Sequence, residues 1–115
     1  MELGIRRVYE PATEGEGRRV LVDGLWPRGV PKTALAGVPW LKAVAPSAAL
    51  RRWFGHDPAK WDGFRRRYFA ELDAKPAAVA ELRAAIGRGR ATLLFGARDA
   101  AHNNAVALRE YLLRR

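Results

Sequence analysis

Short apolar runs, separated by glycine, proline and charged residues, mark the expected strands at both ends of the chain. The first run covers Ile5–Tyr9, and Pro11 and the polar segment 13–17 follow it. Two further runs, at 19–23 and 91–95, have unbroken apolar centres, which indicates strands buried on both faces of a sheet. The link between the first two runs is too short for a helical crossover, so we expect them to pair as an antiparallel hairpin.

Apolar residues recur at helical spacing in most of the chain between the second and third expected strands, and again after the third. The loop before the first helix, residues 26–46, contains four prolines, and we expect one helical turn in it near 33–35. The expected helices span 48–54, 58–72, 76–86 and 100–113. Ser47, Asp57 and Asp99 stand where N-cap residues are expected for the first, second and last of them.

This order of elements predicts a single α/β domain over residues 1–115, with a small, mainly parallel sheet of about three strands and helices packed around it. The two buried strands should run parallel in that sheet. Ligands of such sheets bind outside the carboxyl ends of the strands. Here those ends are 23–28 and 96–99, where polar and charged residues follow apolar runs.

The composition excludes several classes of protein. The chain has no cysteine, which excludes disulfides, thiolate zinc sites and a cysteine nucleophile. No stretch approaches the roughly 20 apolar residues that span a bilayer. The N-terminus lacks the apolar core of a secretion signal, so we expect a cytoplasmic protein without a membrane partner.

A formal net charge of +9 points to anionic partners, since basic residues near phosphates gain free energy by releasing counterions. A second explanation stays open: 17 of the 21 basic residues are arginine and alanine is abundant, a bias typical of GC-rich genomes. The basic residues are scattered in short clusters rather than gathered in one stretch.

Polar residues at the two strand ends form the candidate ligand-binding site. Asp23, at the end of a buried strand, needs a partner, and Arg28 is the expected one. Asp23 is then either a functional residue, as a base or as an acceptor that orients a ligand, or part of a structural ion pair that holds the proline-rich loop. Trp26 either stacks on a planar ligand or anchors the loop. The other candidates are Lys32, Arg98, Asp99, Asn103 and Asn104, while Lys42 and Arg51 could add positive charge.

The two histidines offer little chemistry of their own. His56 is a second candidate for proton transfer, but its neighbour Asp57 is expected to cap a helix. His102 should lie in the first turn of the last helix, where the helix dipole disfavours its cationic form. Two histidines and no cysteine disfavour a transition-metal site. Carboxylate-bound magnesium stays open, but no pattern in the sequence supports it, so we expect neither a metal nor a cofactor.

Several strings are specific enough to suggest relatives. Val22-Asp23-Gly24-Leu25-Trp26-Pro27-Arg28-Gly29, the segment from Ala45 to Asp57 and the segment from Ala97 to Ala105 resemble the YeaO-like family, a domain of unknown function, and the resemblance covers nearly the whole chain. Because the function of that family is unknown, the resemblance identifies relatives of this chain but does not imply a reaction. Gly24 stands where the family string VDRLWPRG has arginine, and Phe95-Gly96 replaces a tyrosine followed by alanine or serine. More distant relatives carry Cys-His-Arg near the last helix, so thiol chemistry does not transfer to this chain.

Three functional hypotheses remain open from the sequence. The leading one is binding of an anionic ligand, with nucleotides and nucleic acid as candidates, in which Arg28 and Arg98 hold the anion. The second is a metal-free enzyme that uses Asp23 or His56 for proton transfer. The third is an interaction module whose arginine and tryptophan surface docks a protein partner.

Overall fold

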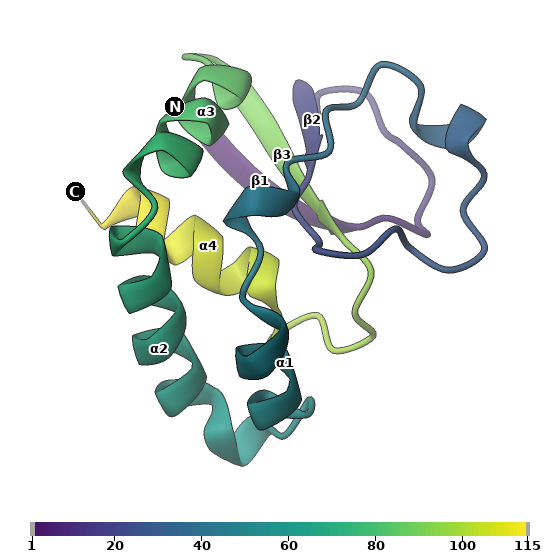
Figure 1. Ribbon diagram of the computed structural model, residues 1–115. Coiled ribbons are helices and arrows are strands. Elements are labelled where there is room, and N and C mark those ends of the chain that lie inside the picture. The colour runs from purple at the N-terminus through teal and green to yellow at the C-terminus, as the bar shows by residue number, and fades with distance from the viewer. Residues whose placement is uncertain (1, 115) are drawn as a thin grey trace.

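The centre of the molecule is a sheet of three parallel strands in the computed structural model, which describes residues 2–114. The strands are β1 (Glu2–Arg7), β2 (Arg18–Leu21) and β3 (Arg90–Phe95), and β3 lies between the other two (Figure 1). Helices pack around this sheet, so the expected α/β class with a small parallel sheet is confirmed.

The expected antiparallel hairpin between the first two strands is wrong. Leu93 in β3 pairs with Ile5 of β1 on one side and with Val20 of β2 on the other. The chain from 8 to 17 crosses back to the start of β2 as a loop, without a helix. The apolar pattern explains this order, because five of the six residues of β3 are buried and such a strand needs hydrogen-bonding partners on both edges.

Four helices follow the pattern of N-caps and glycines within residues 2–114. Ser47 Oγ accepts the Leu50 N–H at 3.1 Å, and Gly55 ends the same helix in the left-handed conformation. The expectation that Asp57 caps the second helix is wrong: Asp57 caps a short 3₁₀ turn, and the α-helix begins after Lys60. The helices are α1 (Ala48–Phe54), α2 (Trp61–Asp73), α3 (Pro76–Ile86) and α4 (Asn104–Leu113), and the 3₁₀ turns are η1 (Lys32–Leu35), η2 (Lys42–Val44) and η3 (Pro58–Lys60).

The last helix begins four residues later than the sequence pattern predicts, and Asp99 is not its N-cap. Asp99 Oδ1 accepts the N–H groups of Ala101 and His102, at 2.8 and 3.0 Å, and so closes a separate turn before the helix. Asn103 is the N-cap, with extended backbone angles and Oδ1 accepting the Val106 N–H at 3.0 Å. Both residue types cap helices well, so the sequence alone did not distinguish them.

The two faces of the sheet are covered by different parts of the chain. Alternate residues of β3 divide between them: Leu93 and Phe95 belong to the main core under the helices, whereas Leu94 faces the opposite side. Helices α3 and α4 lie against the sheet, and α2 packs on both of them (Figure 1). The proline-rich loop covers the other face with Trp26, Leu35 and Trp40. This loop is therefore a structural layer of the fold.

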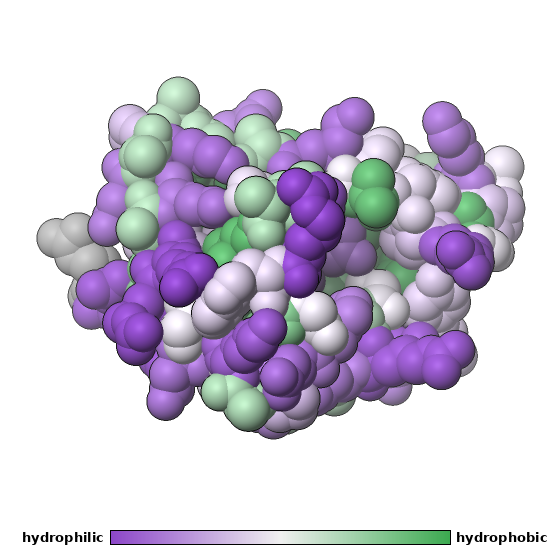
Figure 2. Space-filling model, turned by 60° about the horizontal axis from the view of Figure 1, so that its bottom comes forward, coloured by the Kyte–Doolittle hydropathy of each residue, from purple (hydrophilic) through white to green (hydrophobic). Residues whose placement is uncertain are grey.

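The exterior is mostly hydrophilic. Figure 2 shows a face on which strongly hydrophobic residues appear as separate spots among hydrophilic ones. The large hydrophobic residues classed as exposed in the described part of the chain are Tyr9, Leu25 and Leu113. None of the described helices combines the length and the apolar character needed to cross a bilayer.

Leu93→Ala should destabilise the protein by about 2–5 kcal/mol, because Leu93 is fully buried at the centre of the sheet and its truncation leaves a cavity. Leu25→Ala is the matched control: Leu25 is 69% exposed, so its truncation should change the free energy of unfolding by less than about 0.5 kcal/mol. Urea unfolding followed by circular dichroism measures both. Equal effects of the two variants would contradict the central position of β3.

Candidate functional site

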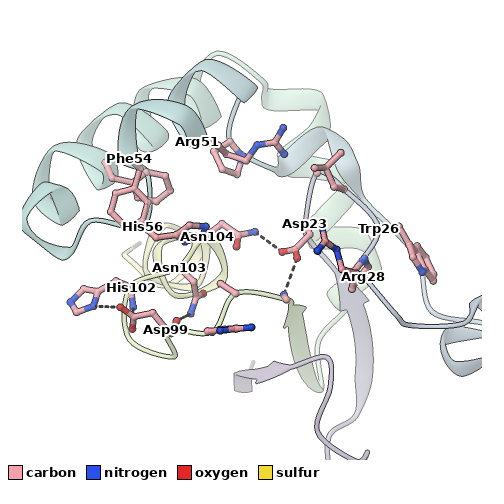
Figure 3. Close-up of a pocket in the computed structure, with 18 of the residues that line it drawn as sticks. Asp23, Trp26, Arg28, Arg51, Phe54, His56, Asp99, His102, Asn103 and Asn104 are labelled. Carbon is pink, nitrogen blue, oxygen red and sulfur yellow. Dashed lines mark hydrogen bonds and ion pairs between the residues drawn. The ribbon is translucent and has the colours of Figure 1, made fainter.

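A cavity of about 710 Å³ opens where the carboxyl ends of β2 and β3 meet the start of α4, beside α1 (Figure 3). Its lining includes both strand-end segments singled out from the sequence, 23–28 and 96–99. The candidate residues that line it are Asp23, Trp26, Arg28, His56, Arg98, Asp99, Asn103 and Asn104. Lys32 is not among the lining residues and lies instead over the ring of Trp26, with Nζ 6.0 Å from the ring centroid.

The Asp23 carboxylate is bonded to the protein through both oxygens. Oδ2 accepts the Gly96 N–H at 2.8 Å, and Oδ1 accepts a hydrogen bond from Asn104 Nδ2 at 3.1 Å. Asn104 Nδ2 also donates to the Val22 carbonyl at 3.1 Å. Asp23 therefore joins the ends of β2 and β3 to the first residue of α4, as the dashed lines in Figure 3 show.

The expected ion pair between Asp23 and Arg28 is wrong. Within residues 2–114 no ion pair joins them, and the partners of the carboxylate are the amide groups of Gly96 and Asn104. Arg28 is exposed, and its backbone carbonyl accepts a 2.7 Å hydrogen bond from the Tyr9 hydroxyl. Neutral donors satisfy a half-buried carboxylate as well as a cation can, provided that they are fixed in place, and here a strand end and a helix start fix them.

Burial raises the pKa of Asp23 above its usual value. The hydrogen bonds from Asn104 and Gly96 and the charge of Arg51 act in the opposite direction, but burial is the largest contribution. The carboxyl group of Asp23 therefore holds its proton to a higher pH than an exposed aspartate does.

Asp99 and His102 form a second polar contact at the edge of the cavity. His102 Nδ1 and Asp99 Oδ2 are 2.9 Å apart, and the His102 ring meets Trp61 edge to face with 5.3 Å between ring centroids. The pKa of Asp99 is lowered, first by the Ala101 N–H and then by His102. Because α4 begins at Asn104, the expectation that His102 lies in its first turn is wrong.

Trp26 borders the cavity but is held by the loop itself. Its indole N–H donates to the Val30 carbonyl at 2.7 Å, and its ring meets Trp40 edge to face at 5.3 Å. The Trp40 indole in turn donates to the backbone carbonyl of Asp23 at 2.7 Å. These contacts favour the interpretation of Trp26 as a loop anchor.

His56 lies at the opposite end of the lining and is exposed. Its φ angle is 57°, in the left-handed region, directly after Gly55. Its ring lies 6.3 Å from the Phe54 ring, centroid to centroid. Asp57 does not orient it, because the Asp57 carboxylate accepts the Ala59 N–H at 3.0 Å.

Three arginines line the cavity: Arg28, Arg98 and Arg51. The hydrogen bonds and ion pairs within residues 2–114 include none from their guanidinium groups. Arg51, half-buried on α1, was treated in the sequence only as an additional charge. No feature of the sequence indicates that Arg51, rather than the adjacent Arg52, faces the cavity.

Metal chemistry gains no support from the geometry. Over residues 2–114, no three histidine, cysteine, aspartate or glutamate side chains are grouped so that they could hold a metal ion. The polar groups of the cavity are instead amides, guanidinium groups, the imidazoles of His56 and His102, the Tyr9 hydroxyl and two carboxylates that already accept hydrogen bonds.

Comparison with known proteins places the chain among uncharacterised relatives. The family described as the inactive DUF488-N3 subclade matches residues 2–115. An uncharacterised protein of Mycobacterium tuberculosis is 42% identical over 108 residues, which cover 94% of this chain and 91% of that protein. The uncharacterised protein YeaO of Escherichia coli is 38% identical over 112 residues, 97% of each chain. No solved structure matches the chain.

Asn104→Ala should raise the pKa of Asp23 further, because it removes the largest of the influences that lower it. A folded-state pKa above the unfolded one means that this group stabilises the fold below the unfolded pKa, and that this contribution is lost as pH rises through the folded pKa. As pH rises from the unfolded-state pKa of Asp23 through its folded-state pKa, the free energy of unfolding should therefore fall further in the variant than in the wild type. The ¹³C shift of the Asp23 carboxyl group against pH, together with urea unfolding at each pH, measures both effects.

Asp99 serves as the internal control of this titration. Its pKa is lowered by groups of its own turn, which Asn104→Ala leaves in place. An Asp23 titration that does not respond to Asn104→Ala would show that the bond between these side chains is absent in solution.

Proposed function

The chain belongs to the YeaO-like DUF488 family, within its inactive DUF488-N3 subclade, and we propose that it is a non-catalytic domain that binds a small anionic ligand in the cavity at the strand ends. Arg28, Arg51 and Arg98 supply the positive charge of this site. Asp23 and Asn104 hold the surrounding segments in position.

The observation that carries the proposal is the imbalance between paired and unpaired charge in the cavity. Both carboxylates in its lining have protein partners: Asp23 accepts from Gly96 and Asn104, and Asp99 accepts from its own turn. The guanidinium groups of the three lining arginines have none within the described residues. Guanidinium groups that face a concave surface without an acceptor favour a ligand that brings oxyanions.

The geometry favours a small molecule over nucleic acid. A cavity of about 710 Å³ is in the size range of small-molecule sites, roughly 300–1,000 Å³. Several arginines outside it are engaged with the protein: Arg65 pairs with Glu110, and Arg67 lies over the Trp53 ring at 3.9 Å. These two arginines are therefore less available to a phosphate backbone than free surface cations are.

A binding role also fits the residues better than an enzymatic one. The family description names the subclade inactive. Asp23, the first candidate for proton transfer, uses both oxygens to join the strand ends to α4. His56 is the second candidate for proton transfer, and the neighbouring Asp57 does not orient its ring, because the Asp57 carboxylate caps a turn. The third hypothesis, a protein-docking surface built on Trp26, loses support because the loop itself packs around that ring.

Thermal unfolding against nucleotides, sugar phosphates, aromatic carboxylates and inorganic anions tests the proposed function. A ligand at about 100 times its dissociation constant should add roughly 2.7 kcal/mol of stability and raise the Tm by several degrees. Arg28→Ala and Arg98→Ala should each reduce that shift, because each removes a cation from the cavity. The affinity should fall only modestly with salt, since few charges take part.

Arg83→Ala is the control for this experiment: Arg83 is exposed on α3 and does not line the cavity. Its ligand response should equal that of the wild type. Absence of any shift with every anion of the panel would refute anion binding. A steep salt dependence with oligonucleotides alone would instead favour nucleic acid.

A further inference from the structure

We propose that Arg51 receives the anionic group of the ligand, and that Gly24 gives its guanidinium group the room to do so. This inference rests on the proposed function and deepens it by naming the anion-binding residue and the class of ligand. The ligand class is an oxyanion, phosphate or carboxylate, attached to a compact apolar body.

Arg51 differs from the other two arginines of the cavity by its burial. Arg28 and Arg98 are exposed and can be solvated by water, whereas Arg51 is half-buried. No hydrogen bond or ion pair from its guanidinium group occurs within residues 2–114. Donors that are partly removed from water and lack acceptors are costly, and an oxyanion matches the fork of a guanidinium group with two parallel hydrogen bonds.

The room for this guanidinium group exists because residue 24 has no side chain. A Cβ atom at Gly24 would lie 2.3 Å from Arg51 Nη1 and 3.5 Å from Arg51 Cζ, with the Ala45 Cβ at 3.3 Å on another side. Gly24 is not among the glycines with positive φ, so its backbone conformation does not itself require glycine. The absent side chain therefore serves the position of Arg51.

The helix that carries Arg51 is fixed at its start. Ser47 caps α1 through the Leu50 N–H, and Glu71 of α2 accepts hydrogen bonds from the Ser47 N–H and hydroxyl at 2.8 and 2.6 Å. From this base the Arg51 side chain reaches toward the segment that contains Asp23 (Figure 3). It forms no ion pair with Asp23 within the described residues, although its charge lowers the pKa of that carboxyl group. The guanidinium group thus lines the cavity near the strand ends, with its donors unused by the protein within the described residues.

The other walls of the cavity indicate what the anion is attached to. Pro46, Phe54 and Phe64 line the same cavity as Arg51, and the exposed Leu25 lies at its edge. The Phe54 and Phe64 rings are almost fully buried already, so the apolar surface that a ligand can still cover includes the exposed Leu25. A ligand with an aromatic or aliphatic body can cover Leu25, which a bare inorganic ion leaves in contact with water, so an organic phosphate or carboxylate should bind more tightly than the inorganic ion.

Isothermal titration calorimetry of the full chain with phenyl phosphate and with inorganic phosphate tests this assignment. Arg51→Ala should weaken the binding of phenyl phosphate by about tenfold to a hundredfold, the usual effect of losing a hydrogen-bonded charge. Gly24→Ala keeps every charge but places a methyl group where the guanidinium group lies. Because that group is the end of a flexible side chain and can shift, Gly24→Ala should weaken binding measurably, but less than Arg51→Ala does. The double variant should bind no more weakly than the weaker single one, because both changes remove the same contact.

Arg52→Ala is the matched control, since Arg52 is the exposed neighbour on the same helix and does not line the cavity. It should bind phenyl phosphate as the wild type does. Circular dichroism shows whether each variant folds. If Gly24→Ala does not fold, the affinity of Arg51→Lys for phenyl phosphate tests the role of the Arg51 guanidinium group instead. Lysine keeps the charge but loses the fork, so binding should fall between that of the wild type and that of Arg51→Ala.

The outcomes separate this inference from the proposed function. Wild-type affinity in Arg51→Ala would overturn the role of Arg51, and wild-type affinity in folded Gly24→Ala would overturn the role of Gly24. Weaker binding in Arg28→Ala and Arg98→Ala would still support anion binding in the cavity in either case. Equal affinity for phenyl phosphate and inorganic phosphate would overturn the ligand class. If the wild type binds no anion of the panel, the proposed function and this inference both fall.

Discussion

The hydrogen bonds of the Asp23 carboxylate hold together the end of the fold at which the cavity forms. One oxygen is bonded to the Gly96 N–H at the end of β3, and the other to the Asn104 side chain at the start of α4. Asn104 also reaches the carbonyl of Val22, and Trp40 reaches that of Asp23. Strand, helix and proline-rich loop therefore meet at one half-buried carboxyl group. Its raised pKa reflects the cost of placing it there.

This arrangement divides the charged residues of the cavity into two kinds. Asp23 and Asp99 are structural residues, since their carboxylate oxygens accept hydrogen bonds from other groups of the protein. The guanidinium groups of Arg28, Arg51 and Arg98 have no such partners within residues 2–114. Under the proposed function, an anionic ligand would supply the acceptors that these cations lack. Such binding would need no proton transfer, in keeping with the description of the matching family as an inactive subclade.

Much of the fold follows from local patterns, whereas long-range choices do not. The Ser47 cap and the Gly55 and Gly87 ends fix helix boundaries through neighbours along the chain, and the sequence predicted them. Asp57 starts a 3₁₀ turn rather than α2 itself, so the predicted start of that helix was three residues too early. The position of β3 between β1 and β2 depends on pairing residues about 70 to 90 positions apart, which no local signal specifies. The choice of Asn103 over Asp99 as the cap of α4 depended on two residue types of similar capping strength.

In the candidate site, too, local patterns predicted some features, and contacts between distant parts of the chain set others. The rule that ligands gather at the carboxyl ends of parallel strands led to the cavity and to most of its lining. The partners of Asp23 were missed, because amide donors far along the chain replace the nearby Arg28. Lys32 was included as a further positive charge in the loop, but it lies over the Trp26 ring and does not line the cavity. Gly24 was noticed as a departure from the family string, but its contact with Arg51 is visible only in three dimensions.

The central claim is that an anionic ligand binds at the unpaired guanidinium group of Arg51, beside the Asp23 junction. The most direct measurement is a titration with phenyl phosphate, followed by ¹H–¹⁵N NMR of arginine side-chain Nε–Hε groups and backbone amides. The account predicts that the largest shifts occur at Arg51 Nε–Hε and at the amides of Gly24 and Gly96, and that they saturate together. Shifts spread evenly over surface arginines, with Arg51 and Gly24 unchanged, would contradict it.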